Sequence, residues 1–107
     1  MSGGKGAAAA GLTEKDRRRL EAEARQRRSS VEGPIKKEIA RLEERISALE
    51  TAQKEREAQL ADPALYNDFA KAKPLMDTHR AGKEELEQLY AQWEAAQEKL
   101  SQVAASV

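Results

Sequence analysis

Cysteine is absent from the 107-residue sequence, and the chain has only three prolines, one tryptophan, one phenylalanine and two tyrosines. Without cysteine the chain forms neither a disulfide nor a thiolate metal site, and a cytoplasmic location is the default expectation. Aromatic residues make up 4% of the chain and charged residues 36%. That composition excludes a domain built around a thick hydrophobic core.

Long hydrophobic runs are also missing. The alanine run at residues 7–10 is too short, and its surroundings are too poor in leucine, for a signal peptide or a membrane span. We therefore expect residues 1–12 to be a flexible linker or a cloning remnant. No membrane partner is expected.

Alanine, glutamate, lysine, leucine and arginine are abundant, as in long helices that bury a narrow stripe. The sequence therefore predicts an all-α protein. Its formal net charge is zero, but residues 1–34 hold eight Lys or Arg against five Asp or Glu, whereas residues 35–107 hold eleven against fourteen. The first third of the chain is thus basic and the remainder is acidic.

Residues 13–33 are predicted to form a basic N-terminal helix. Thr13, followed three residues later by Asp16, resembles a capping box. Acidic and basic residues recur four positions apart, which supports a helix: the pairs are Glu14–Arg18, Glu21–Arg25 and Glu23–Arg27. Few apolar side chains accompany these charges, so the helix either leans on another element or forms only in part.

Two later stretches repeat their residues in alternating steps of four and three, the spacing of a coiled-coil seam. The first seam comprises Ile35, Ile39, Leu42, Ile46, Leu49, Gln53, Arg56 and Leu60. The second comprises Leu75, His79, Gly82, Leu86, Leu89, Trp93, Ala96, Leu100, Val103 and Val107. Two seams of similar length, joined by a short connection, predict an antiparallel two-helix coiled-coil hairpin over residues 34–107. The pairing register stays open.

Two seam residues have side chains that occur in functional sites elsewhere. We interpret Trp93 as a core residue that packs near Leu42 to Ile46. His79 is the only histidine, and one imidazole cannot build a metal site. The neighbouring pair Glu43 and Glu44 points in different directions on a helix and forms no catalytic dyad. No catalytic residue, metal or cofactor is expected.

Residues 62–74 are predicted to form the tip of the hairpin. Proline at position 63 ends the first long helix, and Asp62 is suited to cap a short helical segment that runs to about Lys71. Pro74 is then expected to start the return helix.

The tip also holds three large apolar side chains, Leu65, Tyr66 and Phe69, on one face of the predicted short segment. Since the exposed end of a hydrophobic seam needs a cover, we expect these side chains to fold back and close it. Contact with a partner is the alternative.

Three sequence segments resemble the C-terminal coiled-coil domain of ABC-F ATPases. They are KKEIARLEERISALE, QLADPALYND and LEQLYAQWEAAQEKL. Pro34 matches the hinge before the first arm, and Trp93 matches the tryptophan of the return arm. The remaining matches, Asp62, Leu65 and Tyr66, lie in the loop between the arms.

The resemblance implies the tail of a larger protein whose two nucleotide-binding domains hydrolyse ATP and act at the ribosome. Such a tail contacts nucleic acid, either duplex DNA or ribosomal RNA, or the ribosome, together with the ATPase domains of its parent protein. The chain itself has no phosphate-binding loop, because GGKGAAAAG lacks the required glycine spacing and the Ser or Thr. We therefore expect binding without catalysis, by a monomer.

Basic residues before and just after Pro34 are the candidate nucleic-acid-binding residues, because phosphates attract them without sequence preference. They are Arg17, Arg18, Arg19, Arg25, Arg27, Arg28, Lys36 and Lys37. Four acidic residues are interspersed among them, so an ordinary solvated surface is the alternative. A structural coiled-coil module that mediates protein–protein contacts is the alternative function.

Overall fold

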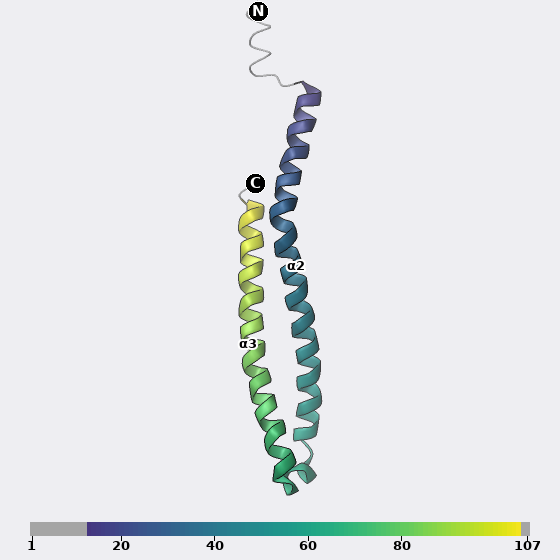
Figure 1. Cartoon of the computed structure of the whole chain (residues 1–107), viewed down its shortest axis with the longest axis vertical. Coiled ribbons are helices and arrows are strands. Elements are labelled where there is room, and N and C mark those ends of the chain that lie inside the picture. Colours follow the sequence, from purple (N-terminus) through teal and green to yellow (C-terminus); the bar gives the residue numbers. More distant parts are fainter. Residues whose placement is uncertain (1–12, 106–107) are drawn as a thin grey trace, which may run out of the picture.

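The structure, a computed structural model, describes residues 13–105 and consists of two long helices joined at one end (Figure 1). Helix α2 runs from Glu14 to Leu60 and helix α3 from Phe69 to Ala105, with the short 3₁₀ helix η1, Pro63–Asn67, between them. The long helices lie side by side and antiparallel. The predicted all-α hairpin is confirmed.

Both predicted seams lie between the helices. Every seam position within the described residues is buried or half-buried, and Val107 lies outside them. The core is densest at Leu42, Ile46 and Leu89, which are at most 7% exposed. Packed against this cluster are Leu49, Leu86, Trp93 and Ala96. The predicted position of Trp93 is therefore confirmed.

Contacts across the hairpin fix the pairing register that the sequence left open. Arg45 Nη2 lies 2.8 Å from Glu85 Oε1, and the Tyr90 hydroxyl donates to Glu50 Oε2 at 2.7 Å. The bond to this carboxylate raises the pKa of Tyr90 above its ordinary value. Both contacts lie on the surface, so they specify alignment more than they add stability.

Proline 34 does not separate two helices. The helices predicted on either side of it are one continuous helix, with Pro34 in its interior. A proline there leaves the carbonyl of Ser30 without its helical N–H partner. Ser30 and Pro34 are both exposed, so water can hydrate that carbonyl and the helix continues.

The tip differs from the prediction in where the return helix begins. Asp62 caps η1 as predicted, its Oδ1 accepting from the Ala64 N–H at 3.0 Å, with Pro63 as the first residue. Helix α3, however, starts five residues before Pro74. The Asp68 carbonyl begins it by accepting from the N–H groups of Lys71 and Ala72, each at 3.0 Å.

Most of the predicted apolar cover at the tip is wrong. Leu65 is half-buried, but Tyr66 is 52% exposed and Phe69 is 67% exposed. Tyr66 does fold back, because its hydroxyl donates to the Leu60 carbonyl at 2.7 Å. The seam is closed instead by Ala72, which is fully buried. A methyl group fills the narrow space that the larger side chains were expected to occupy.

A polar layer interrupts the apolar seam between its middle and the tip. The Gln53 side chain is only 4% exposed and donates through Nε2 to the His79 carbonyl at 2.8 Å. Its Oε1 accepts from Arg56 Nη1 at 2.6 Å. Gly82 makes room for this amide, since a Cβ at position 82 would lie 2.5 Å from Gln53 Oε1. A polar seam residue of this kind specifies register at a cost in stability.

We predict that Gly82→Ala lowers the free energy of unfolding by about 1 kcal/mol. The added methyl group displaces the Gln53 amide from its two hydrogen bonds, and this loss exceeds the gain in helix propensity of about 1 kcal/mol. Chemical denaturation monitored by circular dichroism measures the change. In a Gln53→Ala background the same substitution should be stabilising, and an equal cost in both backgrounds would show that Gly82 is not needed to make room for the Gln53 amide.

The indole N–H of Trp93 lowers the stability of the fold. Its Nε1 is buried and finds no hydrogen-bond partner among the described residues. An unsatisfied buried donor costs roughly 1–3 kcal/mol. We therefore predict that Trp93→Phe changes the free energy of unfolding by less than about 1 kcal/mol, since relief of this cost offsets the lost contacts.

Denaturation of Trp93→Ala provides the comparison. Truncation of a large core aromatic typically costs roughly 3–5 kcal/mol, less at a half-buried position. A loss of clearly more than about 1 kcal/mol on Trp93→Phe would contradict an unsatisfied indole N–H.

Candidate nucleic-acid interface

The first part of α2 projects beyond the end of α3 as a single helix (Figure 1). We call residues 14–33 the basic arm. Almost every side chain from Glu14 to Val31 is exposed, and even its larger apolar residues, Leu20 and Val31, are 43% and 50% exposed. From Glu14 to Val31 the arm therefore presents its charges to solvent, whereas Glu32, with a side chain 13% exposed, lies where the arm joins the hairpin.

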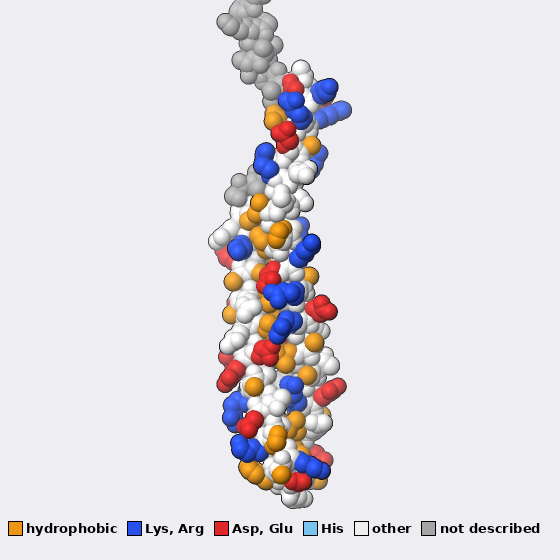
Figure 2. Space-filling model, viewed as in Figure 1, with side chains coloured by type: hydrophobic (Ala, Val, Ile, Leu, Met, Phe, Trp, Pro, Cys, Tyr) orange, Lys and Arg blue, Asp and Glu red, His pale blue; other side chains and the backbone are white. Residues whose placement is uncertain are grey.

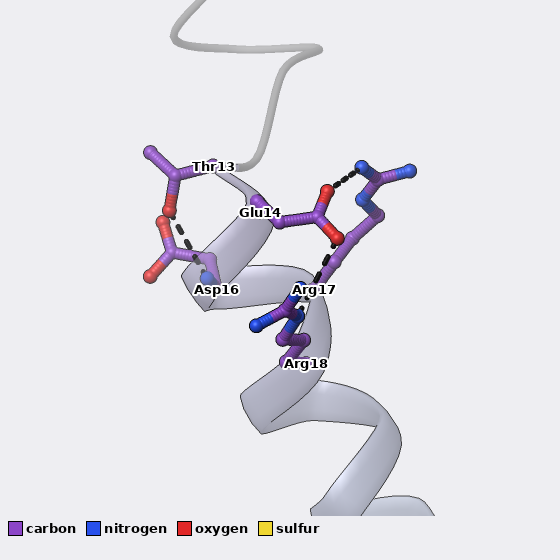
Figure 3. Close-up of polar contacts among 5 residues, drawn as sticks. All are labelled: Thr13, Glu14, Asp16, Arg17 and Arg18. Carbon is purple, nitrogen blue, oxygen red and sulfur yellow. Dashed lines mark hydrogen bonds and ion pairs between the residues drawn. The ribbon is translucent and has the colours of Figure 1, made fainter.

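Local interactions begin the basic arm as the sequence predicts. Thr13 is the N-cap, and its Oγ1 accepts from the Asp16 N–H at 3.0 Å (Figure 3). Glu14 and Asp16 place negative charge in the first turn, which favours the positive end of the helix dipole. Of the three predicted acid–base pairs, the Glu14–Arg18 pair forms, at 3.5 Å between Oε1 and Nε.

Charged residues occupy the seam positions of the basic arm. The four-three spacing of the first seam continues upstream of Ile35 without a break, but through polar residues only: Glu32, Arg28, Arg25, Glu21, Arg18 and Glu14. The basic arm therefore has no apolar stripe in line with the first seam on which another helix could pack. The hydrophobic seam therefore begins near Ile35, whereas helix α2 itself extends upstream to Glu14.

Half of the predicted binding residues are already engaged by carboxylates. Glu14 lies between Arg17 and Arg18 and pairs with both (Figure 3). Arg19 Nη2 lies 3.5 Å from Asp16 Oδ1, and Lys36 Nζ lies 3.6 Å from Glu32 Oε2.

The other half are unpaired: Arg25, Arg27, Arg28 and Lys37 form no ion pair with any residue that the structure describes. Three of these four lie within four consecutive positions, 25–28. Glu21, Glu23 and Glu32 each lie one helical turn from one of the three arginines, but none of them forms an ion pair with it. We call Arg25, Arg27 and Arg28 the free arginine cluster.

The eight predicted residues do not form one continuous patch. Arg25, Arg28 and Lys36 line a shallow hollow of about 190 Å³ on one side of α2, together with Ser29, Glu32 and Gly33. Since successive residues turn by about 100°, Arg27 and Lys37 point to other sides of the helix. The structure thus brings three of the eight residues together and places the others around them.

Residues 13–105 contain neither a metal-binding cluster nor a membrane-spanning helix. Among residues 13–105, no group of three His, Asp or Glu side chains is arranged to hold a metal ion. Nor is any helix in that range long and apolar enough to cross a lipid bilayer. His79 is held by Glu57, with 3.2 Å between Nε2 and Oε1. It is a seam residue, as its position predicts.

A family model described as ABC transporter C-terminal domain matches residues 35–98, more than half of the chain. The chain belongs to this family. The match confirms the resemblance to the C-terminal coiled-coil domain of ABC-F ATPases. No curated protein and no solved structure gives a significant match.

The matched range shows which part of this ABC transporter C-terminal domain is shared with its family. It covers the hairpin and the tip, and it includes Lys36 and Lys37 but none of the six candidate arginines. The family is a C-terminal domain and not an ATP-binding domain. The family match therefore does not extend to the basic arm.

We predict that Thr13→Ala unwinds the start of the basic arm without changing the melting temperature of the hairpin. Loss of an N-cap costs about 1 kcal/mol, and the arm has too little packing to transmit that loss. Amide hydrogen exchange measures both regions at once. A matching loss of protection at Leu42 and Leu89 would instead show that the arm and the hairpin unfold together.

Proposed function

We propose that this domain is a nucleic-acid-contacting appendage of an ABC-F ATPase, which binds phosphate backbone through its basic arm and has no catalytic activity of its own. The observation that carries the proposal is the free arginine cluster on an exposed helix. The larger assembly would act in the cytoplasm, with this domain as its monomeric arm.

Charge and exposure both favour phosphate as the ligand of Arg25, Arg27 and Arg28. A guanidinium group already paired with a carboxylate must exchange one anion for another, whereas an unpaired group gains an interaction outright. Exposed side chains also need little desolvation before they reach a phosphate. The free arginine cluster should therefore contribute more to binding than Arg17, Arg18 and Arg19, although both sets carry the same charge.

The spread of positive charge around the arm suits a backbone ligand. Arg25 and Arg28 point to one side of α2 and Arg27 to another, so phosphates on two sides of the helix are within reach. The basic arm contains no aromatic side chain, which argues against base stacking there. Duplex DNA and folded ribosomal RNA both present the required array of phosphates.

Fluorescence anisotropy with a labelled DNA duplex and a structured RNA hairpin tests the proposal. We predict that replacing Arg25, Arg27 and Arg28 with Gln weakens binding roughly a hundredfold, at about 1 kcal/mol or more for each lost contact. The slope of log affinity against log salt should fall by about 1 for each lost phosphate contact. The tighter ligand identifies the class of nucleic acid.

A matched control is available within the same helix. Replacing Arg17, Arg18 and Arg19 with Gln removes the same formal charge from residues that are already paired, and should weaken binding much less. Equal losses in both triple variants would show that total charge, and not the free arginine cluster, determines affinity. Absence of salt-sensitive binding to either ligand would exclude the proposal.

A structural coiled-coil module is the second candidate function. It is favoured by the exposure of Leu20 and Val31 on the basic arm, because a helix packed on a partner would bury them. Sedimentation equilibrium distinguishes the two candidates. A monomer mass at micromolar concentration supports the appendage, whereas a dimer that dissociates on Leu20→Glu supports the coiled-coil module.

A further inference from the structure

A serine shares the surface of the free arginine cluster. Figure 2 shows Lys and Arg side chains along the single-helix part of the molecule, separated by the white surface of uncharged polar side chains and backbone. Ser29 is one of the uncharged residues of this part. It lines the hollow of about 190 Å³ together with Arg25 and Arg28, and it lines a second hollow of about 490 Å³ together with Arg25. Ser29 therefore lies beside both arginines.

The hydroxyl group of Ser29 is not engaged by the protein. It forms no hydrogen bond with any residue between positions 13 and 105. The adjacent Ser30 differs, because its Oγ donates to the Gln26 carbonyl at 2.7 Å. Both serines are exposed, so their hydrogen bonds and not their burial distinguish them. Ser29 keeps an O–H donor that is available to an anion in the hollow.

The hollow has a positive excess of one charge. Arg25 and Arg28 form no ion pair with any residue in the described range. Lys36 and Glu32 neutralise each other, with 3.6 Å between Nζ and Oε2. Glu21, one turn before Arg25, is the remaining carboxylate nearby. Two unpaired arginines against this one carboxylate suit a single phosphodiester, which carries one negative charge.

We propose that Arg25, Arg28 and Ser29 together hold one phosphate of a nucleic-acid backbone, with the hydroxyl and both guanidinium groups donating to its oxygens. Serine hydroxyls and arginines recur as the donors to backbone phosphates, where they fix the position of the strand on the protein. The inference rests on the proposed function and adds an uncharged binding residue to it. Arg27 points to another side of α2 and is left to a different phosphate.

Anisotropy titrations of the full chain with the same labelled DNA duplex and RNA hairpin test this phosphate site. Ser29→Ala should weaken binding roughly threefold to tenfold, as expected for one lost hydrogen bond. The slope of log affinity against log salt should not change, because a hydroxyl group releases no counterion. Alanine favours a helix more than serine does, so a weaker helix cannot explain the loss. Circular dichroism checks the helix content.

Ser30→Ala is the matched control. It removes a hydroxyl group whose hydrogen bond stays within the helix, so its affinity should equal that of the parent chain. Ser29→Thr keeps a hydroxyl group at the site and should recover most of the affinity lost in Ser29→Ala. Equal affinity of Ser29→Ala and the parent chain, or equal losses in the two alanine variants, would overturn the proposal.

A double-mutant cycle tests whether the three side chains share one phosphate. Ser29→Ala should be non-additive with Arg25→Gln and with Arg28→Gln, and additive with Arg27→Gln. Additivity with all three arginines would overturn the shared site and leave the nucleic-acid-binding function of the basic arm intact. Absence of salt-sensitive binding by the parent chain would instead exclude that function, and the phosphate site with it.

Discussion

The hairpin depends on the packing of one stripe of each helix against one stripe of the other. Leu42, Ile46 and Leu89 form the densest part of this contact. A two-helix structure has no third element to bury a second face, so the seam must supply both the attraction and the alignment of the helices. Side chains beyond the seam are left to water, which explains how a chain with 36% charged residues still folds.

Polar residues limit how the two stripes can pair. An entirely apolar seam packs almost equally well after a shift of one heptad, whereas a buried amide must keep its own partners. Gln53 finds them only where Gly82 leaves room and the His79 carbonyl is in reach. The same reasoning applies to Arg45 with Glu85 on the surface. Apolar packing holds the helices together, and these polar contacts choose one alignment among several.

Sequence reasoning identified the seams because their four-three spacing is visible in the chain itself. The sequence-based predictions were wrong where the surroundings of a residue, and not its type, decide its conformation or its burial. Pro34 stays within a helix because its surroundings are open to water, and Phe69 stays exposed because Ala72 already fills the end of the seam. Ala72 continues the second seam by a step of three from Leu75, but a small residue gives a weak hydrophobic signal.

The candidate site shows the same limit in its charges. Composition located the arginines, but it could not separate those already paired from those left free. That difference depends on which rotamers bring Glu14 to Arg17 and Arg18 and leave Arg27 unpaired although Glu23 lies one turn away. The aromatic side chains of the tip posed the opposite difficulty. Their residue types suggested burial. In the structure the smaller Ala72 closes the seam, and Tyr66 and Phe69 are left exposed to solvent.

The unbroken course of α2 through Pro34 fixes a rotational phase between the basic arm and the hairpin. Each residue turns the helix by about 100° and lengthens it by about 1.5 Å. One residue inserted next to Pro34 would therefore swing Arg25 and Arg28 to a different side of the molecule, while seven would nearly restore their direction about 10 Å farther out. A chain with an interrupted helix at this point would have no such relation. Here the number of residues alone sets both the direction and the distance of the arginines from the coil.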